Sequence, residues 1–245
     1  MAAVPYKEST LSKKGQVEEM FDHISPKYDL LNHLLSVNID KLWRRKAIRM
    51  LKPLGPRTIL DVATGTADFA IAAAKLNPQK ITGIDLSEGM LKVGRQKVQR
   101  KGLAHMIELV KADSEALPFD DHSFDASIVG FGVRNFEKLQ QGLTEIHRVL
   151  KPGGEFIVLE FSRPKNKIFS SLYFFYFKKV LPWLGRRISK NSRAYSYLPE
   201  SVQQFPDGVD FVDILIKTGF KNCTFKPLTG GIATIYKAQK EKIVF

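Results

Sequence analysis

Residues 58–68 read Thr-Ile-Leu-Asp-Val-Ala-Thr-Gly-Thr-Ala-Asp, and this stretch decides the fold class. Residues 58–62 form a short apolar run, which is typical of a buried strand. A turn rich in Gly and Thr follows, and residues 68–76 then have helical periodicity. A strand followed by a tight turn and a helix is the first unit of a βαβ fold.

The same alternation continues along the chain. Strands alternating with helices of 10–15 residues predict a parallel sheet with right-handed connections. Near the C-terminus, the turn residues 227–231 lie between two apolar runs, so the sheet is expected to end in an antiparallel hairpin. We therefore expect an α/β fold with a mostly parallel seven-stranded sheet and helices on both faces. The further strands are predicted at 81–85, 107–112, 124–129, 155–161, 220–225 and 232–238, and the helices between them at 87–101, 137–150 and 207–218, with the sequence LKPGG at 150–154 as a stop and turn.

Residues 17–35 are predicted to be helical, with a break at Pro26 and Ser25 as N-cap of the second part. Asp40 is predicted to cap a helix over residues 41–51. We expect one domain over residues 1–245. Its parts are an N-terminal helical lid (1–52), a cofactor-binding half (53–161), a basic aromatic insert (162–206) and a C-terminal helix and hairpin (207–245).

The charge balance points to an anionic partner without choosing one. The chain has 245 residues and a formal net charge of +13, which suits nucleic acid, an acidic membrane surface or an acidic small molecule. Cys223 is the single cysteine, so an intramolecular disulfide is excluded, a Cys-based metal site is disfavoured and a reducing cytoplasm is expected. The longest apolar run, residues 172–177, is far shorter than the roughly 20 residues of a membrane-spanning helix.

Much of the charge lies in the insert. Residues 161–199 contain no acidic residue, nine basic residues and ten aromatic residues. An aromatic stripe at helical spacing is usually core packing beside a solvated basic flank. The alternative is a peripheral contact with a membrane surface, because Lys and Arg combined with Phe and Trp on a short helix is the composition of such contacts.

Acidic residues stand at the ends of successive predicted strands. Asp85 ends the second strand, where it can accept hydrogen bonds from ribose hydroxyls, and Asp113 follows the third strand. Asp61 stands before the first turn, where a carboxylate would disfavour a pyrophosphate. A single acid here is more often a cap or a solvated strand end. Three together favour a cationic nucleoside without phosphate, which describes S-adenosylmethionine.

Residues 58–161 resemble the class I S-adenosylmethionine-dependent methyltransferases, which have a Rossmann-like fold. One departure from that pattern is clear. The usual glycines at positions 63 and 67 are both Ala in this chain, where their methyl groups can crowd the methionine part of the cofactor.

Four further segments are similar to the quinone C-methyltransferases of menaquinone and ubiquinone synthesis. The resemblance implies S-adenosylmethionine-dependent methylation of a ring carbon of a polyprenylated hydroquinone, with demethylmenaquinone as the first choice of substrate and the ubiquinone precursor as the second. A bacterial enzyme is expected, since little chain precedes the resemblance. The segments are FDHISPKYDLLN (21–32) with Ser36 and WRR (43–45), FGVRN (131–135), RVLKPGG (148–154) with LEFSRP (159–164), and YLPESV (197–202).

The resemblance also implies site residues. Thr66, Asp85, Asp113 and Ser114 fall at cofactor-contacting positions, whereas Gly130 stands where the family often has Ser. No metal site is expected, and the sequence leaves the oligomeric state open.

Methylation of a hydroquinone carbon is easier from its phenolate, so the enzyme should stabilise an oxyanion. Arg134 is the candidate catalytic residue, through an oxyanion or a water that takes the proton; the alternative is a salt bridge to Glu137 or Glu160. His23 and His33 are possible bases, although a lone His on a helix is more often structural. Tyr28 and Trp43 are interpreted as packing residues of the lid.

Two rival functions remain. A nucleic-acid methyltransferase would suit the basic aromatic insert, but the chain has neither an Asn/Asp-Pro-Pro-aromatic motif nor a Pro-Cys nucleophile. A non-catalytic binding module would follow if Ala63 and Ala67 closed the cofactor cleft.

Overall fold

The structure is a computed structural model that describes residues 3–29, 36, 38–164 and 193–242. The helical stripes predicted within the insert lie outside the described residues, as do His33 and the end of the predicted N-terminal helix.

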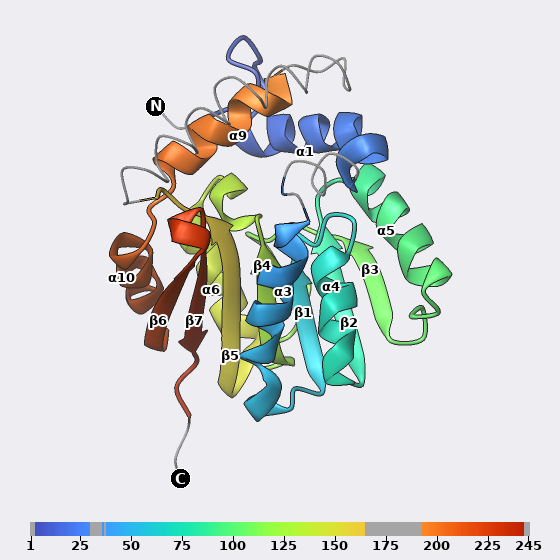
Figure 1. Ribbon diagram of the computed structural model, residues 1–245, viewed down its shortest axis with the longest axis vertical. Helices are drawn as coiled ribbons and strands as arrows, with labels where there is room; N and C mark the ends of the chain where they lie inside the picture. Colours follow the sequence, from blue (N-terminus) through green and yellow to red (C-terminus); the bar gives the residue numbers. More distant parts are fainter. Residues whose placement is uncertain (1–2, 30–35, 37, 165–192, 243–245) are drawn as a thin grey trace.

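Seven strands form one sheet in the order β3-β2-β1-β4-β5-β7-β6. The first five strands run parallel, and β7 lies antiparallel between β5 and β6. This arrangement confirms the mostly parallel sheet with an antiparallel C-terminal pair (Figure 1). The strands are β1 Thr58–Val62, β2 Lys80–Asp85, β3 Ile107–Lys111, β4 Phe124–Gly130, β5 Leu150–Phe161, β6 Lys221–Leu228 and β7 Ala233–Gln239.

Helices cover both faces of the sheet. One hydrophobic cluster packs α3, α4 and α5 against one face, and a second packs α6 and α10 against the other. Two more helices, α1 and α9, cross above the carboxyl ends of the parallel strands at the top of Figure 1. The bounds are α1 Lys13–Ile24, α3 Ile39–Arg49, α4 Asp68–Ala73, α5 Glu88–Arg100, α6 Leu139–Val149, α9 Arg193–Gln204 and α10 Val209–Lys217.

Helices α1 and α9 form a cap with its own small core. Val17 and Met20 of α1 are buried in one cluster with Tyr197 of α9. Side-chain hydrogen bonds of Gln16 to the backbone of Tyr6 and Leu11 fix the segment that leads into α1. The cap therefore joins two parts of the chain that are far apart in sequence, over the edge of the sheet where open α/β proteins bind ligands.

The capping predictions were partly wrong. Helix α1 begins at Lys13, four residues before the predicted start at residue 17, and Ser12 is its N-cap. The chain does break at Pro26, but Ser25 lies inside a short 3₁₀ turn and its hydroxyl donates to the carbonyl oxygen of Asp22. Asp40 lies in the first turn of α3 behind Asn38, because its carboxylate pairs with Arg44 instead of capping the helix.

The LKPGG turn was also predicted wrongly, because residues 150–154 belong to β5. Leu150 pairs with Phe124, and the register then shifts before Glu155 pairs with Ala126. The turn-forming residues thus bend a strand instead of ending it, with Gly153 at φ +81°. Helix α9 was not predicted, since Pro199 stands inside it.

No helix in the described part of the chain is both long and apolar enough to cross a membrane.

Candidate functional site

A pocket lies at the carboxyl ends of β1, β2, β3 and β4, below α1. The free space inside it is about 60 Å³, roughly two water molecules, because α1 covers it. A ligand of nucleoside size therefore requires α1 to move. The lining residues are Lys14, Val17 and Phe21 of α1, with Ala63, Ile84, Asp85, Leu86, Ala112, Ser114, Glu115, Gly132, Asn135, Phe136 and Glu137.

Asp61 stands at the end of β1 and is fully buried. Its Oδ2 accepts hydrogen bonds from Thr64 Oγ1 at 2.6 Å and from the backbone N of Ala70 at 2.9 Å. Its Oδ1 has no hydrogen-bond partner among the described residues. Burial raises the pKa of Asp61 to about 7, against the lowering effect of the two hydrogen bonds. A buried carboxylate oxygen without a donor suits a ligand that brings an N–H group or a positive charge.

Asp85, at the end of β2, lines the pocket and holds the neighbouring turns in place. Its Oδ2 accepts the backbone N–H of Gly65 at 2.8 Å, and its Oδ1 accepts that of Ser87 at 2.9 Å. Burial raises its pKa to about 6, although these hydrogen bonds act in the opposite direction. Each oxygen keeps a lone pair for a further donor such as a ribose hydroxyl.

Of the other three predicted cofactor residues, one lines the pocket and two do not. Ser114 lines the pocket. The carboxylate of Asp113 forms an ion pair with Lys14 of α1, which also pairs with Glu115 at 3.0 Å. The hydroxyl of Thr66 donates to Asp29 and accepts a hydrogen bond from Lys97 at 3.0 Å. Asp85 and Ser114 thus meet at the pocket, while Thr66 and Asp113 are engaged by other side chains.

The turn after β1 has left-handed backbone at both alanines that replace glycine. The φ angles are +53° at Ala63 and +67° at Ala67, a region that favours glycine. The methyl group of Ala63 lines the pocket beside Gly132, where an added Cβ would lie only 2.6 Å from it. Gly132 in the loop after β4 therefore leaves room for the methyl group of Ala63 within the protein.

These features fit S-adenosylmethionine. Asp85 on the pocket wall suits its ribose. Asp61 is fully buried two residues before the wall residue Ala63, and its unpartnered Oδ1 suits an ammonium group. The pocket walls include the apolar side chains of Ile84, Leu86 and Phe136, which suit an adenine ring. Lys14 is the one basic side chain on the wall, and it is already paired with two carboxylates.

Arg134 lies in η4, a 3₁₀ turn over Val133–Asn135 that follows β4. Its Nη1 pairs with Oε1 of the fully buried Glu160 at 2.7 Å, and its side chain is 7 % exposed. Its guanidinium stands 5.5 Å from the ring centre of Phe161. Its Nε is buried without a hydrogen-bond partner. The predicted alternative of a salt bridge therefore exists with Glu160, and one donor of the same side chain remains unused.

A hydrogen bond from α9 fixes the residue after Arg134. The hydroxyl of the buried Tyr197 donates to Oδ1 of Asn135 at 3.0 Å. Burial raises the pKa of Tyr197 to about 12, so the phenol stays protonated as a donor. This hydrogen bond fixes the orientation of the Asn135 amide, whose NH₂ remains a donor beside the pocket that Asn135 lines. The sequence motifs contain both residues, but only the fold brings them together.

A second cavity of about 280 Å³ adjoins the first across Phe136 and Glu137, which line both. Arg134 is on its wall, together with Lys13 of α1. Nζ of Lys13 donates to the carbonyl oxygens of Arg134 and Phe136, at 3.2 and 2.8 Å. Helix α1 therefore contacts both cavities, one through Lys13 and the other through Lys14.

Three aromatic rings pack behind Arg134. Trp43 of α3 lies against Phe131 and Phe161, with ring centres 6.3 and 6.5 Å apart. The indole N–H donates to Thr229 Oγ1 at 2.9 Å. Phe131 has a φ of +60°, a strained angle that is often found at functional sites. Trp43 thus packs, as expected.

The remaining candidates have local roles. His23 is exposed, and its Nδ1 lies 2.8 Å from the carbonyl oxygen of Glu19, one helical turn earlier. Tyr28 packs edge-on against Phe21 at 5.9 Å. In the described ranges, no three His, Cys, Asp or Glu residues gather as a metal site would require.

Comparison with known proteins identifies the family of this chain. A family model described as the ubiE/COQ5 methyltransferase family matches residues 9–240. The chain is 48 % identical over 229 residues to a protein from Bacteroides fragilis named demethylmenaquinone methyltransferase, covering 93 % of this chain and 94 % of the relative. It is also 48 % identical to the ubiquinone/menaquinone biosynthesis C-methyltransferase UbiE of Geotalea daltonii, covering 94 % and 99 %. A crystal structure of the cyclase SpnF has the same fold, with a TM-score of 0.68 at 17 % identity over 99 % of this chain and all of that one.

Proposed function

The chain belongs to the ubiE/COQ5 methyltransferase family, and we propose that it methylates a ring carbon of a polyprenylated hydroquinone with S-adenosylmethionine. The first choice of acceptor is demethylmenaquinol, which yields menaquinol, and the alternative is the corresponding ubiquinone precursor. The relatives carry both names. The observation that carries the proposal is a pair of adjoining cavities, one lined by acids and the other by Arg134.

The first cavity is proposed as the cofactor site. When bound, S-adenosylmethionine supplies an electrophilic methyl group on a sulfonium. Asp85 would accept hydrogen bonds from the ribose hydroxyls, and Asp61, which is buried just outside the pocket wall, would accept them from the ammonium group. Ser114 and Asp113 hold the adenine end once Lys14 has left Asp113. Thr66 positions the turn between these groups through its hydrogen bonds to Asp29 and Lys97.

Arg134 is proposed as the catalytic residue. A hydroquinone carbon becomes a far better nucleophile when the neighbouring hydroxyl has lost its proton. The unused Nε–H of Arg134 and its positive charge stabilise that phenolate oxygen, and a water takes the proton. Glu160 keeps the guanidinium fixed. Holding the two reactants in line supplies much of the remaining acceleration.

We place the reaction at the cytoplasmic face of a membrane, since the isoprenoid tail of such an acceptor stays in the bilayer. The basic aromatic insert, residues 162–206, is proposed as a membrane contact on its composition of Lys, Arg, Phe and Trp. Salt-sensitive flotation of the protein with anionic vesicles supports a membrane contact, and absence of binding at every salt concentration contradicts it.

Transfer of a labelled methyl group to demethylmenaquinol and to the ubiquinone precursor, measured side by side, tests the function. Arg134→Ala should lower kcat by about 10²–10³ and leave the Kd of S-adenosylmethionine unchanged. The matched control is Arg95→Ala, which removes an ion-paired arginine on α5 that lines neither cavity. Absence of methyl transfer to either acceptor overturns the function, and an unchanged kcat removes Arg134 from the mechanism.

A further inference from the structure

The outer face of α3 is unusual in composition. Five residues of α3 are exposed, and they are four cations and one leucine: Lys41, Leu42, Arg45, Lys46 and Arg49. The one acid of this helix, Asp40, is buried and paired with Arg44. Lys41 and Arg45 are four residues apart, as are Leu42 and Lys46, so the set follows one face of the helix.

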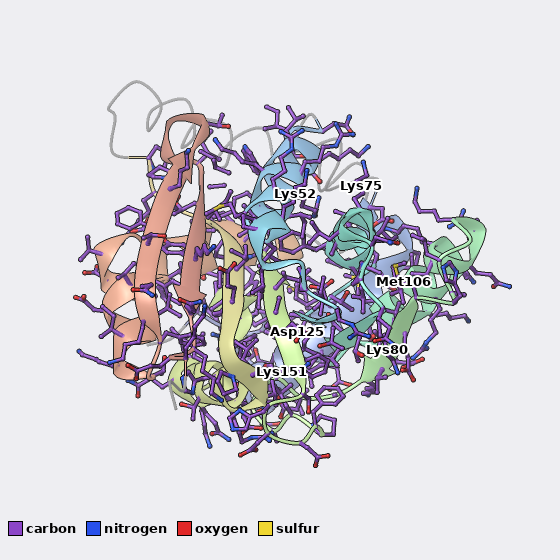
Figure 2. The ribbon with its side chains drawn as sticks, turned by 90° about the horizontal axis from the view of Figure 1, so that it is seen from below. Lys52, Lys75, Lys80, Met106, Asp125 and Lys151 are labelled. Carbon is purple, nitrogen blue, oxygen red and sulfur yellow. The ribbon has the colours of Figure 1, made fainter. Side chains whose placement is uncertain are left out.

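Within the described part of the chain, the cations of this face have no acidic partner. None of its four cations forms an ion pair or a side-chain hydrogen bond with another described residue. Exposed cations elsewhere often do, as in Lys80 with Glu108 and Lys111 with Glu18. Lys52 and Lys75 are also exposed, beyond the C-terminal end of α3. Figure 2 labels both on the same side of the molecule as α3.

The inner face of the same helix reaches the site. Trp43 and Ile48 are buried against the sheet, and the ring of Trp43 contacts Phe131 and Phe161, which lie next to Arg134. A helix is about 10–12 Å thick with its side chains. One helix therefore separates the cationic face from the aromatic wall behind Arg134.

We propose that the exposed face of α3 docks on an anionic lipid bilayer. The inference rests on the proposed function, because it supposes that the acceptor is a lipid held in that bilayer. Clustered Lys and Arg residues are attracted by anionic headgroups. Leu42, which is 58 % exposed among these cations, supplies the apolar side chain that enters the headgroup region. The residues of this face lie outside the basic aromatic insert in the sequence.

The composition of this face favours lipid over nucleic acid. Proteins that bind single strands combine cations with exposed aromatic side chains on which the bases stack. The aromatic residue of α3 is Trp43, and it is buried. A leucine among lysines and arginines offers nothing to a base but fits the boundary between headgroups and acyl chains.

Two triple variants with equal net charge test the proposal. K41Q/K46Q/R49Q removes three charges from the α3 face, and K92Q/K101Q/R100Q removes three exposed charges at α5 and its end.

Binding is measured by co-sedimentation with vesicles of phosphatidylglycerol and phosphatidylcholine. Each charge that meets the surface contributes about fivefold to binding, so the α3 triple should bind anionic vesicles roughly a hundredfold more weakly. The α5 triple should bind as the wild type does. Equal losses in the two triples, or no loss in the α3 triple, overturn the proposal.

Leu42→Gln separates lipid from nucleic acid. It should weaken binding to anionic vesicles severalfold and leave binding to a single-stranded oligonucleotide unchanged. A wild-type protein that prefers the oligonucleotide to the vesicles contradicts the proposal.

An activity measurement separates this inference from the function on which it rests. The α3 triple should methylate a short-tailed, water-soluble hydroquinone at the wild-type rate and a vesicle-borne one more slowly. Equal rates on the vesicle-borne acceptor overturn the docking face alone. Absence of methylation of both acceptors by the wild type overturns the function alone, since vesicle binding is scored independently.

Discussion

At the scale of single residues, two buried carboxylates govern how the cofactor pocket responds to pH. Asp61 and Asp85 have pKa values raised to about 7 and about 6 by burial. The unfolded chain ionises both near pH 4, so the folded protein holds protons that the unfolded one has lost. Their contribution to stability is therefore full below about pH 4 and is lost as the pH rises through 6 to 7.

Binding of a cationic cofactor should reverse this preference. A positive charge beside Asp61 favours its ionised form, so binding releases a proton below pH 7. We expect the affinity for S-adenosylmethionine to rise about tenfold between pH 6 and pH 8. Calorimetry in two buffers of different ionisation enthalpy measures both the affinity and the proton release. Asp61→Asn should flatten the dependence, and a flat profile in the wild type would contradict a carboxylate contact.

The strained alanines make a second prediction at this scale. Ala63→Gly removes a side chain from a left-handed position at the pocket wall and should raise the free energy of unfolding by about 0.5–1 kcal/mol. Ala67→Gly relieves the same strain but loses a fully buried methyl group, worth about 0.8 kcal/mol, so its net effect should be close to zero. Urea denaturation of the two variants provides the comparison. Destabilisation by Ala63→Gly would show that its methyl contact with the loop after β4 outweighs the strain.

Residues at strand ends were predictable, and their distant partners were not. Asp85 could be placed because the carboxyl end of a parallel strand follows directly from the apolar run before it. The pairing of Asp113 with Lys14 joins residues about a hundred positions apart, and no local pattern encodes it. Arg134 and Glu160 fall between these cases. The order of the strands placed Arg134 and Glu160 at the ends of neighbouring strands. It did not predict whether Glu137 or Glu160 would pair with Arg134.

At the scale of elements, α1 acts as a cover over the cofactor pocket. Lys14 pairs with Asp113 and Glu115, and Asp22 accepts hydrogen bonds from the hydroxyl of Ser87 and the backbone of Gly89. The pocket that remains is too small for a nucleoside. Any cofactor that reaches it therefore binds only the fraction of molecules in which α1 has moved.

Loosening this cover should strengthen cofactor binding. Lys14→Gln removes two partly buried ion pairs, each worth up to about 1 kcal/mol, and frees Asp113 for the cofactor. We expect the Kd of S-adenosylmethionine to fall by roughly two- to tenfold and to lose its dependence on salt. Lys80→Gln, which breaks an exposed pair at the far end of β2, is the control. A higher Kd in Lys14→Gln would mean that Lys14 contacts the bound cofactor.

The elements themselves were predictable where local preference and tertiary pairing agree. The first four strands lie within two residues of their predicted ends, since buried parallel strands are continuous apolar runs. In residues 150–154 local backbone preference and tertiary strand pairing disagree. Pro152 and Gly153 favour a turn, but backbone hydrogen bonds between Gly153, Gly154 and Lys240 keep the segment in the sheet. Sequence patterns show the local preference and not the tertiary pairing.

At the scale of the whole molecule, the positive charge and the acidic pocket belong to different surfaces. The net charge of +13 includes the exposed cations of α3, while Asp85 and Glu115 line the pocket below α1. A cationic cofactor therefore meets local negative charge on a protein that is positive overall.

The cofactor should stabilise the entire fold, since its pocket joins four strands and α1. A ligand at 100 times its Kd adds about 2.7 kcal/mol to the free energy of unfolding. For a chain of this size the Tm should rise by about 5–10 °C, which differential scanning fluorimetry measures. Asp85→Asn should reduce the shift. A wild-type Tm that does not respond to S-adenosylmethionine would place the cofactor elsewhere.

The position of β7 inside the sheet has a consequence for synthesis on the ribosome. Strand β5 ends at Phe161 and its neighbour β7 at Gln239, so 78 residues separate their completion. At about 5–20 residues per second, this interval lasts roughly 4–16 seconds. During that time the nascent chain carries an open edge of hydrophobic strand, the kind of edge that pairs with other chains. The open edge of β5 is closed by β7, which is the last described strand to leave the exit tunnel.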